Sequence, residues 1–213
     1  AGDDPGCWRR QETMKIARGW RRLTPHVVFN GYTPGLLSVY IPDGERVPER
    51  DVVNFAKEAS LLKEIDVKGS YAQGTSSFMS SWIGYYARSR LLWDVTTDVE
   101  ALKREFYDTF FGPEAGPHVR AWWDACEEAL GAAANHAHEA WLINHVYTVP
   151  FTTSLRSHVE AARKAQMTDR QRARFEAFAL IADYLEAYAA RNAAEMALDY
   201  AAAAEAADRM VDD

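Results

Sequence analysis

Cysteine is scarce in this sequence. Its 213 residues include two cysteines, Cys7 and Cys126, which lie far apart and show no CxxC spacing. A disulfide between them would need Cα atoms within about 7 Å of each other. We predict two separate thiols, buried or half-buried, because free cysteine is among the most buried residue types.

Basic residues and long apolar runs are also few. Lys and Arg number 24 against 31 Asp and Glu, which gives a formal charge of −7. This acidic balance argues against a general nucleic-acid binder, which normally has a basic face. No apolar stretch approaches the ~20 residues that span a bilayer, and no signal-like segment opens the chain. We therefore expect neither a nucleic-acid nor a membrane partner.

Several catalytic motifs are missing as well. The sequence has no nucleophile elbow, no P-loop, no GxGxxG and no HExxH. His136, His138 and His145 cluster near Glu139. Residues two apart on a helix point in different directions, so this cluster indicates a polar turn between helices rather than a metal site. No cofactor and no metal are expected.

The first third of the chain alternates between two kinds of pattern. Helical spacing of apolar residues over 7–23 and 48–65 alternates with β-branched and aromatic segments at 26–32 and 67–73. The order is typical of parallel βα units. Two parallel strands leave unpaired backbone groups at both edges. We therefore expect this part to be the last portion of a larger α/β domain, or to pair with a second copy of the chain.

After Gly74 no segment has the pattern of a strand. The first three predicted helices cover 77–93, the segment from a Thr97–Glu100 capping box to Gly112-Pro113, and the segment from Gly112-Pro113 to Leu130. The last two cover 152–166 and an Ala-rich tail, which runs from a Thr168–Gln171 capping box to Val211. Ala is the best helix former, and the connections are short. The pattern predicts an antiparallel α-helical bundle.

Polar and aromatic residues follow each predicted strand, where parallel α/β folds bind ligands. These candidate substrate-binding residues are Asn30, Tyr32, Tyr40, Tyr71, Gln73 and Trp82. Aromatic rings stack on the apolar faces of sugars, and amides bridge hydroxyl groups. The composition indicates a carbohydrate subsite. In the alternative interpretation, the tyrosines cap the core and Asn30 satisfies a turn.

Carboxyl groups for glycoside cleavage are harder to find. Such cleavage usually needs two of them ~5–10 Å apart, and neither strand end carries one. Glu64 and Asp66 precede the second strand, so we expect them on the opposite, structural face. Asp43 and Glu45 lie on a loop. The catalytic residues stay unassigned, and the main acid is expected on strands outside this chain.

Three segments carry a resemblance to a known family. They are GSYAQG at 69–74, YYARSRLLWD at 85–94 and EFYDTFFGP at 105–113. The chain resembles the helical/barrel C-terminal domain of unknown function in large bacterial glycoside-hydrolase-like proteins that carry an α-glucuronidase-like N-terminal region. LLWD, followed by the Phe-Tyr and Phe-Gly-Pro pattern, is the most specific element.

The resemblance implies an α/β plus all-α fold. Residues 1–75 would be the terminal βα units of a (β/α)8-type barrel, and residues 76–213 a helical bundle domain. Trp93 would pack between them, and Asp94 would be a turn acceptor.

The resemblance also implies carbohydrate processing outside the cytoplasm, in an extracellular or periplasmic protein. The partners would be an oligosaccharide or polysaccharide and the rest of the barrel. Activity of this chain alone is not expected. The alternative is a non-catalytic helical interaction or oligomerisation module.

Overall fold

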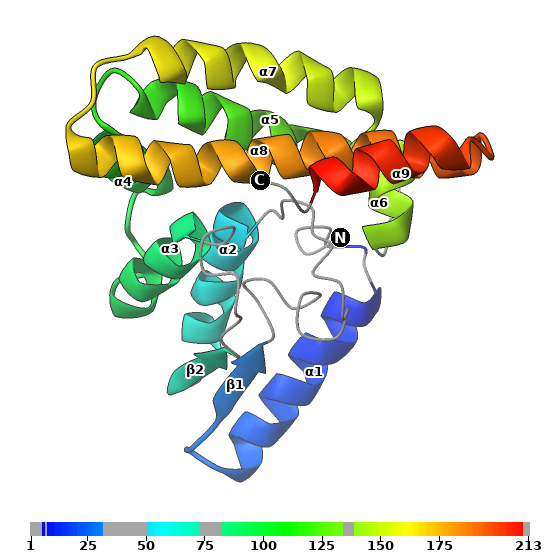
Figure 1. The fold of residues 1–213 in the computed structure, drawn as a ribbon. Helices are drawn as coiled ribbons and strands as arrows, with labels where there is room; N and C mark the ends of the chain where they lie inside the picture. The colour runs from blue at the N-terminus through cyan, green and yellow to red at the C-terminus, as the bar shows by residue number, and fades with distance from the viewer. Residues whose placement is uncertain (1–5, 7, 32–50, 73–81, 134–138, 211–213) are drawn as a thin grey trace. The chain divides into compact units, whose positions relative to one another are not determined.

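The computed structural model describes residues 6, 8–31, 51–72, 82–133 and 139–210, which are mostly helical with two short strands (Figure 1). The elements are α1 (Trp8–Leu23), β1 (Val28–Gly31), α2 (Asp51–Glu64), β2 (Gly69–Ala72), α3 (Trp82–Trp93), α4 (Val99–Phe111), α5 (Gly116–Ala132), α6 (Glu139–His145), α7 (Val149–Lys164), α8 (Asp169–Met196) and α9 (Tyr200–Arg209). They form two compact units, with the division between Lys103 and Arg104.

The two strands of the first unit pair in parallel, as the alternating pattern predicts. Val28 lies opposite Gly69, and Asn30 lies opposite Tyr71. The backbone N–H of Lys68 donates to the carbonyl of Val27 at 2.9 Å, which extends the pairing by one bond. Because α2 connects the strands, the segment is a βαβ unit.

The core of the first unit lies where α2 packs on α3. Its buried members are Val52, Phe55, Ala59, Ala87, Leu91 and Leu102. The α2 members recur at helical spacing, so one stripe of that helix is buried. This packing places α3 in the first unit. The division between the two compact units falls after Lys103, and the predicted domains 1–75 and 76–213 stay a prediction.

The second unit is built around α5, α7 and α8, and α7 runs antiparallel to α8 (Figure 1). Phe178 is almost fully buried, and its ring lies 5.3 Å from Trp122 and 6.1 Å from Phe111, edge-on in both cases. Edge-to-face rings add to the free energy that burial provides. The predicted helices that correspond to α5 and α7 are confirmed, as is the Thr168–Gln171 capping box.

Two local predictions in the helical segments are wrong. The segment predicted as a polar turn contains α6, in which the ring of His145 stacks on Trp141 at 4.4 Å. At the start of α4 the cap is Asp98, not Thr97. The Asp98 carboxylate accepts from the backbone N–H of Glu100 and of Ala101. A carboxylate one residue nearer the first turn reaches these N–H groups directly, so it replaces the predicted box.

The Ala-rich tail forms two helices instead of one. Leu198 has a φ of 60°, and it separates α8 from α9. Asp199 then caps α9 by accepting from the backbone N–H of Ala202 at 3.0 Å. Composition predicts helix throughout this tail, so the break depends on capping rather than on helix propensity.

Candidate functional site

The structure brings two of the predicted sugar-binding residues together. Asn30 in β1 and Tyr71 in β2 are direct partners in the parallel register. Both lie in the carboxyl-terminal halves of their strands, where parallel α/β folds bind ligands. The Tyr71 side chain is 63% exposed. An exposed ring at this position is available for stacking, so Tyr71 is not a cap on the core.

The other four candidates give less information. Trp82 is the first residue of α3, and its side chain is half-buried. Tyr32, Tyr40 and Gln73 lie outside the described residues. The structure therefore places the backbone of Asn30 and the side chains of Tyr71 and Trp82, and the predicted site as a whole stays a prediction.

The two faces of the strand pair differ in exposure. Val28 and Tyr71 are 62% and 63% exposed, whereas Phe29 and Ser70 are half-buried and the Ser70 hydroxyl is fully buried. Successive strand residues point to opposite faces. One face of the pair is thus covered, and the face that carries Tyr71 is open.

The acids that precede β2 have a structural role, as predicted. Glu64 accepts a hydrogen bond from Arg18 of α1 at 3.2 Å. Asp66 is bound by Lys68 and Arg21, and these hydrogen bonds lower the pKa of its carboxyl group from 3.8 to about 2. Both acids attach α1 to the end of α2. Asp43 and Glu45, the predicted loop acids, lie outside the described residues.

A perturbed carboxyl group that sequence reasoning missed lies on α2. Burial raises the pKa of Glu58, and the nearby charge of Arg88 acts in the opposite direction. Arg88 on α3 is 6% exposed, and its guanidinium lies 4.0 Å from the centroid of the Phe55 ring. Neither Glu58 nor Arg88 follows a predicted strand, so the sequence pattern gave no reason to select them as candidate site residues. Because they lie between two packed helices, we assign them to the core of the first unit.

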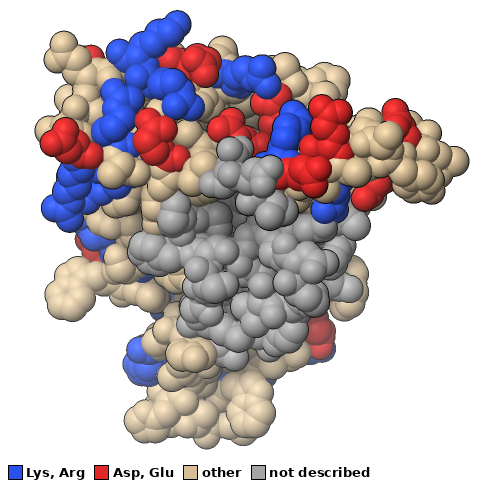
Figure 2. Space-filling model, in the orientation of Figure 1, with Lys and Arg blue, Asp and Glu red and all other residues tan. Residues whose placement is uncertain are grey.

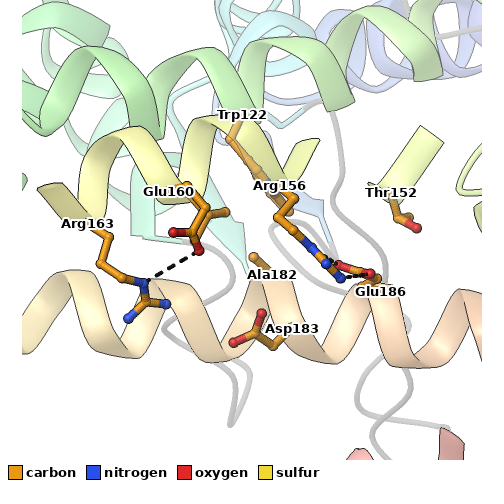
Figure 3. Close-up of a pocket in the computed structure, with 9 residues that line it drawn as sticks. Trp122, Thr152, Arg156, Glu160, Arg163, Ala182, Asp183 and Glu186 are labelled. Atoms are coloured by element: carbon orange, nitrogen blue, oxygen red, sulfur yellow. Dashed lines mark hydrogen bonds and ion pairs between the residues drawn. The ribbon is translucent and has the colours of Figure 1, made fainter. Parts of the chain in front are cut away.

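A pocket of about 340 Å³ lies in the second unit, between α5, α7 and α8 (Figure 3). Trp122 and the buried Thr152 line it together with charged side chains. Arg156 of α7 points toward Glu186 of α8, and ion pairs join them (Figure 3). Arg163 of α7 lies 3.8 Å from Glu160 on its own helix.

The charged groups of this pocket connect the two helices. Arg163 also binds Glu176 of α8 at 3.2 Å, so each arginine on this side of α7 has a carboxylate partner on α8. Acidic and basic side chains are interspersed over this part of the surface in Figure 2. The arrangement fits helix–helix attachment better than catalysis by two carboxyl groups across a substrate.

In the part of the chain that the structure describes, no group of three or more His, Cys, Asp or Glu side chains is placed to hold a metal ion. No helix of that part has both the length and the apolar character to cross a bilayer. His136 and His138 lie outside it, as does Cys7. Cys126 is a free thiol, and burial raises its pKa.

A comparison with family models gives a match over more than half of the sequence. The model described as Domain of unknown function (DUF4838) matches residues 7–124. The chain belongs to this family. The DUF4838 match covers both strands and extends from α1 into α5, beyond the first unit. A search of curated proteins and a search of solved structures found no significant match.

The family match confirms the predicted domain of unknown function. All three segments that carry the resemblance, at 69–74, 85–94 and 105–113, lie within the DUF4838 match. The relation to glycoside hydrolases and to an α-glucuronidase-like region stays a prediction.

Proposed function

We propose that the chain is part of a carbohydrate-processing, glycoside-hydrolase-like protein. Its βα units would be the terminal units of a (β/α)8-type barrel and would contribute sugar-contacting residues, while the second unit would be a helical support domain. The acid pair would come from strands outside this chain, so the 213-residue chain alone would bind sugar without hydrolysing it. The protein would work outside the cytoplasm, as the resemblance implies.

The observation that carries this proposal is the position of Tyr71. Its ring is 63% exposed on the open face of the strand pair, directly opposite Asn30 in the register. A ring that faces solvent next to an amide-bearing residue is the arrangement that a pyranose subsite uses. Among the described residues the sheet has two strands, which supports the barrel part of the proposal, because a two-stranded sheet is marginally stable without further strands.

The test is calorimetric titration of the full chain with neutral and uronate-bearing xylo-oligosaccharides. We expect Tyr71→Ala to weaken binding by about 0.5–1.5 kcal/mol, the worth of one ring contact. Tyr71→Phe keeps the ring and should bind as the parent does. Tyr200→Ala, which removes a 68% exposed ring from the second unit, is the matched control. Absence of binding heat for the parent chain would contradict the proposal.

A second candidate function is a non-catalytic interaction or oligomerisation module. It is favoured by α1, which exposes apolar side chains along one side of the helix. These are Trp8, Ile16, Trp20 and Leu23. Exposed apolar patches of this kind mark protein contacts. The partner would be the rest of the barrel or a second copy of the chain.

Sedimentation velocity separates the two functions. A chain that dimerises, loses this association on Trp20→Ser and gives no heat with oligosaccharides would support the interaction module. A chain that binds oligosaccharide as a monomer would support the sugar-contacting function. Trp93→Ser is the control for a general effect of losing an exposed indole, because Trp93 is 93% exposed and not on α1.

A further inference from the structure

A second pocket lies in the first unit, at the end of β2 opposite to Tyr71. Its volume is about 280 Å³, and its lining comes from the end of α2, the start of β2 and the end of α3. Leu62 and Leu91 form part of its apolar base, and both are buried. The pocket belongs to one unit only, so its shape depends on the packing of α2, β2 and α3.

Trp93 lies at this pocket and is 93% exposed. The indole is therefore not part of the core of the first unit, and its packing between the barrel units and the bundle, which the resemblance implied, stays a prediction. The preceding residue, Leu92, also lines the pocket and is 48% exposed. Two large apolar side chains in sequence thus face solvent at the mouth of a pocket, where an indole provides a flat surface for a ring.

Three polar groups of the lining have capacity for a ligand. The Ser70 hydroxyl is fully buried and has no hydrogen-bond partner among the described residues. Lys63 also lines the pocket, and its positive charge acts on Asp94, where it helps to lower the pKa of the carboxyl group. The Asp94 carboxylate accepts from the backbone N–H and the hydroxyl of Thr96, both at Oδ1, which leaves Oδ2 as an acceptor. Asp94 is a turn acceptor, as predicted.

The remaining charged groups of the rim already have partners. Asp66 is bound by both Lys68 and Arg21, and Arg21 also donates to the Asp66 carbonyl at 3.1 Å. The other charged groups of the lining are one cation, Lys63, and one anion, Asp94. Their charges cancel, so the pocket favours an uncharged ligand that carries several hydroxyl groups over a phosphate or a polyanion.

We propose that this pocket is a second carbohydrate-binding site, in which a neutral pyranose ring stacks on Trp93 and its hydroxyl groups bond to Ser70, Lys63 and Asp94. The choice of a sugar as the ligand rests in part on the proposed function, but this pocket and the site at Tyr71 use different residues. Tyr71 is on the open face of the strand pair, whereas Ser70 points to the covered face. The second site would hold a polysaccharide at a distance from the reacting bond and contribute no catalysis.

The experiment is a fluorine NMR titration of the full chain labelled with 5-fluorotryptophan. The probes are cellohexaose, xylohexaose, mannohexaose and maltohexaose, each titrated separately. The Trp93 resonance is assigned by its loss in Trp93→Phe. We expect it to shift on addition of at least one hexaose, and Trp93→Ala to weaken that binding, measured by calorimetry, roughly three- to tenfold.

Matched variants separate this site from the one at Tyr71. Tyr200→Ala removes a ring that is 68% exposed in the second unit and outside the pocket, and it should leave the affinity unchanged. Ser70→Ala should weaken the hexaose binding that the Trp93 resonance reports. The folded state should lose no stability, because the substitution removes a buried hydroxyl that has no partner among the described residues. Tyr71→Ala should leave the shift of the Trp93 resonance intact.

Each outcome decides between the proposals. A Trp93 resonance that stays fixed with all four hexaoses overturns the second site, whatever Tyr71→Ala does. A shift that survives Tyr71→Ala and disappears in Ser70→Ala supports it. If the Trp93 resonance moves while Tyr71→Ala has no effect on any binding, the second site stands and the site at Tyr71 is wrong.

Discussion

At the scale of single residues, Asp66 combines an unusual backbone conformation with two ion pairs. Its φ is 59°, and its carboxylate is bound by Lys68, which directly precedes β2, and by Arg21 of α1. Asp tolerates the left-handed region better than most residues because its short polar side chain bonds locally. The same side chain therefore ends α2 and connects three elements of the first unit.

The lowered pKa of Asp66 predicts a dependence of stability on pH. Hydrogen bonds from Lys68 and Arg21 lower the pKa from 3.8 to about 2, so the folded state favours the charged carboxylate. The contribution to the free energy of unfolding is complete above about pH 4 and is lost as the pH falls through about 2. Urea unfolding of the parent and of Asp66→Asn between pH 5 and pH 2 measures it.

The control for this pH dependence is Asp94→Asn. Hydrogen bonds from Thr96 lower the pKa of Asp94 as well, but among the described side chains Asp94 makes no ion pair with α1. The difference between the parent chain and Asp66→Asn should shrink toward pH 2, because protonation removes the charge in the parent too. A difference that stays constant over the whole range would contradict the assignment.

Tyr107 is a second residue with a specific energetic consequence. Its side chain is 1% exposed, and its hydroxyl has no hydrogen-bond partner among the described residues. A buried donor without a partner costs about 1–3 kcal/mol of the free energy of unfolding. Tyr107→Phe should therefore stabilise the second unit by about 1 kcal/mol, which thermal unfolding detects as a rise in Tm.

Tyr107→Ala calibrates this measurement. It removes the ring as well as the hydroxyl, and the cavity should destabilise the unit by roughly 3–5 kcal/mol. A loss of stability in Tyr107→Phe would show that the hydroxyl contributes a favourable bond to the folded state.

At the scale of elements, α2 and α8 end in the same way. At α2 the N–H of Val67 donates to the carbonyl of Leu62, and at α8 the N–H of Asp199 donates to the carbonyl of Ala194. Each bond encloses a residue with positive φ, Asp66 or Leu198. Both ends have the hydrogen bonds of a Schellman motif, a position where glycine is the usual residue.

Leu198 lacks the local hydrogen bonding that makes Asp66 acceptable in this conformation. Its side chain is 71% exposed, so little packing offsets the strain of a β-carbon at positive φ. Leu198→Gly should raise the free energy of unfolding by about 0.5–1 kcal/mol. Chemical denaturation of the full chain measures this, and helicity by circular dichroism should stay the same.

Leu198→Ala separates strain from side-chain loss. Alanine keeps the β-carbon and therefore the strain, so this variant should be no more stable than the parent. If Leu198→Ala and Leu198→Gly were equally stabilising, removal of the exposed leucine would be the cause, and the backbone explanation would be wrong.

Gly116 shows a different use of glycine in the second unit. A β-carbon at this position would lie 2.5 Å from the carbonyl oxygen of Tyr107. Two backbones approach closely here, where α5 begins after α4, and only glycine leaves enough space.

At the scale of the whole molecule, the two units have separate cores. The first is formed by α2, α3 and Leu102, whereas the second contains Phe111, Trp122 and Phe178. Residues 97–213, which include all of α4, should therefore fold without the first unit. We expect a helical circular dichroism spectrum and one cooperative thermal transition for this segment.

Phe178→Ala in the same segment is the control, because it removes a ring that contacts both Phe111 and Trp122. It should lower the free energy of unfolding by about 3–5 kcal/mol. A broad, non-cooperative transition of the parent segment would show that the second unit needs residues 1–96 to fold.

Most of the order of elements could be predicted from the sequence, except α6 and the break between α8 and α9. Helical spacing predicted α1 and α2, and β-branched segments predicted both strands. A helix or strand with one apolar side has apolar residues at a regular spacing in the sequence, so these elements can be recognised from the sequence alone. The capping box at Thr168 was predicted for the same reason, because both of its partners lie within one turn.

Tertiary contacts decided the features that join distant residues. The register that pairs Asn30 with Tyr71, the burial of the Ser70 hydroxyl and the exposure of Trp93 all depend on which elements pack together. The resemblance implied that Trp93 packs between the barrel units and the helical bundle, whereas its side chain is 93% exposed. Local pattern reports the apolar side of each element, whereas the packing of α2, β2 and α3 determines which polar groups and rings remain accessible around the pocket at Trp93.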